Sequence, residues 1–121
     1  MDTMESRQEI KIYTSYFSRY KGDNGVSIAL GAPWWKGECY KELAPTKDML
    51  IFWRTSGHGK ENQDIYESMY RRLVLSKLDV HKVARELNGK VLLCFEGPAS
   101  FCHRHIVCKW FKENGYRCEE I

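Results

Sequence analysis

The fold is decided by one stretch, VLLCFEGPASFCHRHI, which spans residues 91–106. Its opening apolar residues predict a buried strand, and the Gly-Pro pair that follows predicts a tight loop. Ser100 is a residue type that favours a helix N-cap, so a helix is expected from about residue 101 to Asn114, with Gly115 at its C-terminal stop. A last strand is expected over residues 117–121. This order predicts a right-handed β-α-β unit.

The rest of the chain supplies the other elements of the same domain. β-branched and aromatic runs predict strands, and apolar residues at helical spacing predict helices. Strands are expected over residues 10–17, 26–30 and 49–54 and a helical turn over 38–43. Helices are expected from about 62–64 and from the N-cap Asp79 to a stop at Asn88-Gly89. The fold class is therefore α/β: a single three-layer domain over residues 9–121, with a mostly parallel, Rossmann-like sheet of about five strands. Residues 1–8 are expected to form a flexible tail.

Composition narrows the classes of function. A net charge of +3 permits an anionic ligand, but it lacks the strong basic excess of many nucleic-acid binders. The five cysteines show no CxxC pair and no disulfide framework. The polar N-terminus and the lack of a membrane-length apolar run predict a cytoplasmic protein with reduced thiols and no membrane contact.

The loop after residue 95 is the predicted site. Ligands of parallel α/β sheets sit at the carboxyl ends of the strands, and a helix N-terminus there attracts anions. Arg104 can clamp a phosphate or carboxylate, and the position of Cys102 favours its thiolate. His103 and Glu96 are candidates for acid-base work beside that thiolate.

Structural roles are open for the same residues. Cys94 lies in an apolar strand and suits core packing, and Cys108 and Cys118 are most simply core thiols. Arg104 can pair with Glu96 instead of a ligand.

Metal and phosphatase chemistry fit the spacing poorly. Cys94, Cys102, His103 and Cys108 have ligand types that suit zinc or iron, but the cysteine intervals of 8 and 6 residues match no zinc module, so no metal and no cofactor are predicted. The loop is not a Walker A sequence, and no cysteine and arginine flank one short anion-binding loop. Cys102 and His103 are adjacent, and neighbours on a helix point about 100° apart, so they form no automatic nucleophile-base pair.

The stretch resembles the C-terminal signature of the domain of unknown function 488 family, small proteins of bacteria and phages. The matching pattern is Cys-x-Glu at residues 94–96, Cys-His-Arg at 102–104, and Gly115 before the last strand. The front of the chain agrees more loosely, through Tyr13-Thr14 and Ser18 followed by Arg19. Residues 29–33 lack the acid and the arginine that the family tends to carry there.

The resemblance implies a three-layer α/β fold and a site where Thr14 and Ser18 meet Cys94, Glu96 and the Cys-His-Arg turn. It supplies no reaction. The predicted ligand-binding residues are Thr14, Ser18, Arg19, Cys94 and Arg104.

Three functions are consistent with these features. The first is binding of an anionic small molecule or nucleic acid, most simply a nucleotide or a nucleic-acid phosphate. The second is an enzyme that uses Cys102 or His103 with Glu96 on such a ligand. The third is an interaction protein in which the cysteine-rich turn only stabilises the fold.

Overall fold

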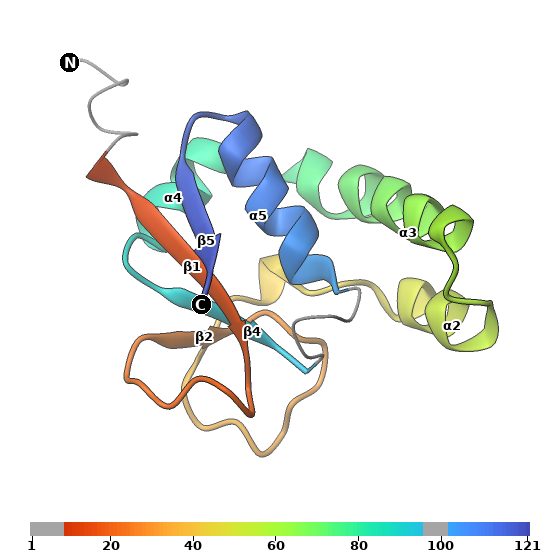
Figure 1. Ribbon diagram of the computed structural model, residues 1–121, viewed down its shortest axis with the longest axis horizontal. Coiled ribbons are helices and arrows are strands. Elements are labelled where there is room, and N and C mark those ends of the chain that lie inside the picture. The colour runs from red at the N-terminus through yellow and green to blue at the C-terminus, as the bar shows by residue number, and fades with distance from the viewer. Residues whose placement is uncertain (1–8, 96–101) are drawn as a thin grey trace.

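A computed structural model describes residues 9–95 and 102–121, and its described strands form one five-stranded parallel sheet in the order β3-β2-β4-β1-β5 (Figure 1). The strands are β1 (Lys11–Tyr16), β2 (Gly25–Ser27), β3 (Glu38–Cys39), β4 (Val91–Cys94) and β5 (Arg117–Glu120). The helices are α2 (Lys47–Thr55), α3 (Lys60–Leu73), α4 (Val80–Glu86) and α5 (His103–Glu113), with short 3-10 turns at Lys41–Leu43 and Leu75–Lys77. The predicted α/β class and five-stranded sheet are confirmed.

Strand β4 lies at the centre of the sheet. Its residues pair in parallel with β1 on one side, where Tyr13 lies opposite Val91, and with β2 on the other, where Val26 lies opposite Leu92. All four residues of β4 are buried, as expected for a strand covered on both faces. The carboxyl ends of β1, β2 and β4 therefore lie together at one edge of the sheet.

Three helix boundaries follow the sequence signals closely. The carboxylate of Asp79 accepts a hydrogen bond of 3.0 Å from the backbone N–H of His81 and so caps α4. Gly89 and Gly115 follow α4 and α5 with φ of 81° and 90°, a conformation that favours glycine at helix ends.

The prediction of a strand over residues 49–54 is wrong, because these residues lie within helix α2. A short apolar run does not distinguish a strand from a helix, and the deciding signal is Thr46. Its side chain accepts a hydrogen bond of 3.2 Å from the backbone N–H of Met49 and caps the helix. The predicted helical turn over 38–43 is also divided: Glu38–Cys39 is strand β3, and only Lys41–Leu43 is helical.

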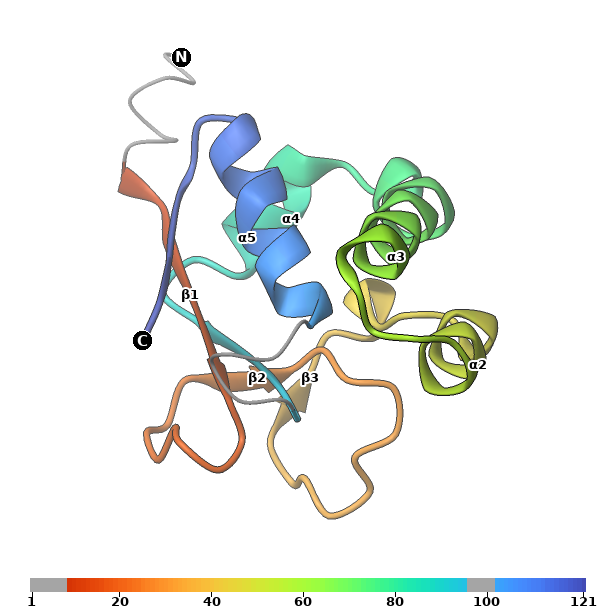
Figure 2. The same cartoon turned by 45° about the vertical axis from the view of Figure 1, so that its right-hand side comes forward.

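A single apolar core joins the sheet to the helices. Ile12, Val26 and Leu92 from three strands belong to one buried cluster with side chains of α3, α4 and α5. Figure 2 shows these helices on the same side of the strands. No helix in the described ranges is long and apolar enough to cross a membrane.

Candidate functional site

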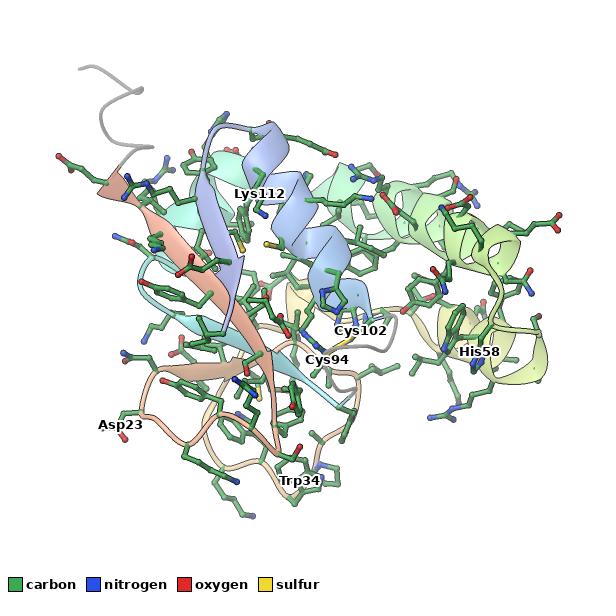
Figure 3. All side chains as sticks on the ribbon, in the orientation of Figure 1. Asp23, Trp34, His58, Cys94, Cys102 and Lys112 are labelled. Carbon is green, nitrogen blue, oxygen red and sulfur yellow. A yellow bond between two sulfur atoms is a disulfide. The ribbon has the colours of Figure 1, made fainter. Side chains whose placement is uncertain are left out.

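Two cysteines meet where β4 ends and α5 begins. Cys94 is the last residue of β4, Cys102 is the N-cap of α5, and their sulfur atoms are joined as a disulfide (Figure 3). The prediction of reduced thiols is therefore wrong for this pair. The sequence does not reveal this pair, because a spacing of eight between two cysteines matches no known framework.

His103 completes a group of three sulfur and nitrogen atoms. Its Nε2–H donates a hydrogen bond of 2.7 Å to the carbonyl oxygen of Ile28, and its Nδ1 lies 3.6 Å from the sulfur of Cys102. The expected divergence of Cys102 and His103 does not apply, because Cys102 has extended backbone angles (φ −152°, ψ 149°) and lies outside the helix. Burial lowers the pKa of His103 to about 4, so the ring is neutral at pH 7.

Arg104 lies directly behind the disulfide and is completely buried. Its Nη1–H donates to the sulfur of Cys94 at 3.0 Å, and its Nε–H and Nη2–H donate to the carboxylate of Glu120 at 3.1 and 2.9 Å. The guanidinium also lies 5.5 Å from the centre of the Tyr16 ring. These contacts hold the positive charge beside a sulfur atom and away from solvent.

Glu120 is the carboxylate that neutralises Arg104. Its Oε1 also accepts a hydrogen bond of 2.5 Å from the hydroxyl of Thr14, a buried residue of β1. Burial on its own raises the pKa of Glu120, but the hydrogen bonds from Arg104 and Thr14 outweigh burial and hold this pKa below its usual value. Thr14, Arg104 and Glu120 thus form one polar network behind Cys94, in which Thr14 and Arg104 are buried and the Glu120 side chain is 30% exposed.

A cavity of about 780 Å³ opens on the other side of the cysteine pair. Its wall includes Cys94, Cys102 and His103 together with residues that follow β2, residues of α2 and α3, and the loop between these helices. This volume lies within the range of small-molecule sites. The cavity also lies at the carboxyl ends of parallel strands, where ligands of α/β sheets bind.

The outer wall of the cavity is aromatic and basic. The rings of Trp53 and His58 stack with centres 4.2 Å apart and planes 1° from parallel, and His58 Nε2–H donates to the carbonyl oxygen of Trp53 at 2.8 Å. Tyr66 packs edge-on against Trp53. Arg54 lines the same cavity, and none of the described residues in its wall is acidic. This wall suits a flat ligand that carries negative charge.

The structure brings together some of the predicted site residues and separates others. Cys94, Cys102 and His103 share the cavity wall, whereas Thr14 and Arg104 lie behind it in the polar network.

The other predicted residues that the structure describes do not line this cavity. Ser18 and Arg19 are exposed in the turn after β1. Glu96 and the predicted N-cap Ser100 lie outside the described residues. Cys108 and Cys118 are buried free thiols, as predicted.

Sequence reasoning missed the wall formed by Trp53, Arg54 and His58. The signal that could have located it was Pro45-Thr46-Lys47-Asp48, which has the proline, capping residue and acid of a helix start. A helix from residue 47 would have placed Trp53 and Arg54 in its last turns.

Cys94, Cys102 and His103 also form a candidate set of metal ligands. Their ligand atoms all lie within 4.8 Å of one another, and all three residues are buried. The spacing in sequence disfavoured a metal set of Cys94, Cys102, His103 and Cys108, whereas the structure groups the first three of these without Cys108.

Comparison with protein families gives one result. The model of the family DUF488-N3a, described as the active DUF488-N3 subclade, matches residues 6–115. This match agrees with the resemblance seen in the sequence and covers most of the chain. Comparisons with curated proteins and with solved structures find no match.

Proposed function

Since the chain belongs to the DUF488 family, in its DUF488-N3a group, we propose that it binds a nucleotide-like anion in the cavity beside Cys94 and Cys102. The observation that carries this proposal is the chemistry of the cavity wall. Arg54 supplies a positive charge, no described wall residue is acidic, and Trp53 and His58 provide stacked rings.

Each part of a nucleotide has a counterpart in this wall. A base can stack on the Trp53–His58 pair, because every base has a flat π-surface. A phosphate can accept the N–H groups of Arg54, which is exposed at the end of α2. The position of the cavity at the carboxyl ends of β2 and β4 is the one that parallel α/β sheets use for such ligands.

Calorimetric titration with the four common nucleoside monophosphates and with a short single-stranded oligonucleotide tests the proposal. Arg54→Ala is expected to weaken binding by about tenfold or more, because it removes hydrogen bonds between two charged groups. Arg85→Ala is the matched control, since Arg85 is an exposed arginine of α4 that does not line the cavity.

Two results would contradict the proposal. One is that the unmodified protein binds none of these ligands. The other is that Arg54→Ala and Arg85→Ala weaken binding equally, which would indicate general charge attraction.

A second candidate function is enzymatic: acid-base or nucleophilic chemistry by Cys102 and His103 on such a ligand. Its support is that both residues border the cavity and that the sulfur of Cys102 lies 3.6 Å from Nδ1 of His103. Incubating the reduced protein with the same nucleotides, followed by intact mass measurement and chromatography of the ligand, would reveal an adduct or a product. Cys102→Ser should abolish either signal.

A further inference from the structure

We propose that Cys94, Cys102 and His103, once the disulfide is reduced, bind a zinc ion whose fourth coordination position opens onto the cavity. This inference goes beyond the proposed binding of a nucleotide and does not rest on it.

The donor set and its placement fit zinc. Two cysteine sulfurs and one imidazole nitrogen lie within 4.8 Å of one another, and two thiolates with one imidazole form a known catalytic zinc set. The Cα atoms of Cys94 and Cys102 are 7.5 Å apart, wider than the 4.4–6.8 Å usual for disulfide-bonded cysteines. Two ligands of one ion tolerate this separation, because the metal lies between the sulfur atoms.

The tautomer of His103 is already the one that a metal needs. A carbonyl oxygen can only accept a hydrogen bond, so the contact with Ile28 places the proton on Nε2. Nδ1 then carries the lone pair, and Nδ1 is the nitrogen that faces Cys102 at 3.6 Å. Metal-binding histidines commonly donate their other N–H to a backbone carbonyl in this way.

Charge also balances at the buried site. Zinc and two thiolates sum to zero, and Arg104 with Glu120 sums to zero beside them. The Nη1–H of Arg104 already contacts the sulfur of Cys94, as an outer-shell donor to a metal thiolate would. A buried cluster without net charge avoids the large desolvation cost of an uncompensated ion.

The open position follows from the cavity. Cys94, Cys102 and His103 all border it, so the side of the cluster without a described protein ligand faces that space. Three protein ligands with an open fourth position are the pattern of catalytic zinc sites, in which a water or substrate atom completes the tetrahedron.

The disulfide makes the site dependent on redox state. A phosphine reductant and one water convert the disulfide into two thiols and leave the phosphine oxide. Zinc then replaces the two thiol protons, which pass to solvent. A small-molecule disulfide added as oxidant reforms the sulfur–sulfur bond, is itself reduced to two thiolates, and so removes both thiolate ligands from the zinc.

The test begins with protein reduced by a phosphine, freed of reductant without oxygen, and titrated with zinc or cobalt. Native mass spectrometry should show one bound ion per chain, and cobalt should give the thiolate charge-transfer and d–d bands of a tetrahedral site. Cys94→Ser should weaken binding by more than the roughly 100-fold that the loss of an outer-shell partner costs. Cys39→Ser is the matched control, because Cys39 is an exposed free cysteine.

A measurement on the unmodified chain covers the case in which Cys94→Ser fails to fold. Zinc should slow alkylation of Cys94 and Cys102 in the reduced protein and leave Cys39 unaffected, as read by peptide mass mapping. Absence of bound metal in the reduced protein overturns the proposal, as does protection of Cys108 and Cys118 in place of the first pair. Nucleotide titration of the oxidised, metal-free protein remains separate, so failure of one proposal does not imply failure of the other.

Discussion

The molecule contains two pairs of buried cysteines, and both join α5 to a neighbouring strand. Cys94 and Cys102 link the end of β4 to the start of α5, whereas Cys108 and Cys118 link the body of α5 to β5. All four are less than 10% exposed, so burial does not distinguish them. Their surroundings do, because the second pair belongs to the apolar core cluster and the first pair does not.

The electrostatic consequences differ accordingly. The first pair touches Arg104, which favours a thiolate at Cys94. In the second pair, the hydrogen bond with Cys108 and burial both raise the pKa of Cys118 well above that of an ordinary thiol. Cysteines of equal burial therefore differ in chemistry according to whether a helix start, a cation and a cavity adjoin them.

The largest expected effect comes from removing the cation at the first pair. Arg104→Met leaves the Glu120 carboxylate without its partner, and because that side chain is 30% exposed, the loss of unfolding free energy should lie at the low end of the range for buried ion pairs, about 3 kcal/mol. Urea unfolding measures this loss. Arg117→Met, on the exposed face of β5, is the control. Equal urea midpoints for the two variants would show that Arg104 does not make the surroundings of the two cysteine pairs different.

A smaller effect is expected at Glu120, which lies two residues after Cys118 on the same face of β5. Glu120→Gln should cost roughly 2 kcal/mol, because it weakens hydrogen bonds made to a charged group. The pKa of Glu120 is lowered by folding, so its contribution is present above the unfolded value and is lost as the pH falls through the folded value.

The measurement for Glu120 is unfolding free energy across the acid range. Glu120→Gln should lose less stability on acidification than the unmodified protein. Glu119→Gln, which alters an exposed salt bridge with Lys11, should retain the original acid dependence. If the unfolding free energy of Glu120→Gln depended on pH as steeply as that of the unmodified protein, the network of Thr14, Arg104 and Glu120 would not be what distinguishes the two cysteine pairs.

The thiols themselves should differ in reactivity. In reduced, chelator-treated protein, iodoacetamide should modify Cys94 faster than Cys118, because only thiolates react and the hydrogen bond with Cys108 and burial raise the pKa of Cys118. Peptide mass mapping over a range of pH measures both rates in one sample. Faster labelling of Cys118 would reverse the assignment of the two environments.

The smallest effect is expected at Cys39, the exposed cysteine of β3. Cys39→Ser should change the unfolding free energy by less than about 0.5 kcal/mol, as surface substitutions usually do. Thermal unfolding checks this value. A larger loss would mean that the β3 edge contributes to the site, and Cys39 could then not serve as a reference thiol.

Sequence reasoning located most of the fold because local signals were strong. Asp79, Gly89 and Gly115 mark helix ends through backbone requirements that do not depend on distant contacts. The strand predicted over residues 49–54 was wrong because an apolar run has the same composition in a strand and in a helix. Because of this error, the contribution of Trp53 to the cavity wall was not predicted.

The site was predicted in its residue types and only partly in its geometry. Cys102 and His103 were identified from the sequence. The extended backbone of Cys102, which places its sulfur beside the His103 imidazole, is not encoded by the local residue pattern. Glu120 was overlooked as the partner of Arg104, since nothing in the local sequence links residues 16 positions apart on different elements.

The position of β1 between β4 and β5 has a consequence for folding kinetics. Both of its neighbours, β4 and β5, come much later in the chain, and the hydrogen bond from Thr14 to Glu120 joins residues 106 positions apart. Contacts of such long sequence separation slow the folding of small domains. While the chain is being synthesised, both edges of β1 therefore remain unpaired until β4 and β5 follow. Unpaired strand edges are prone to aggregation, and chaperones shield such segments.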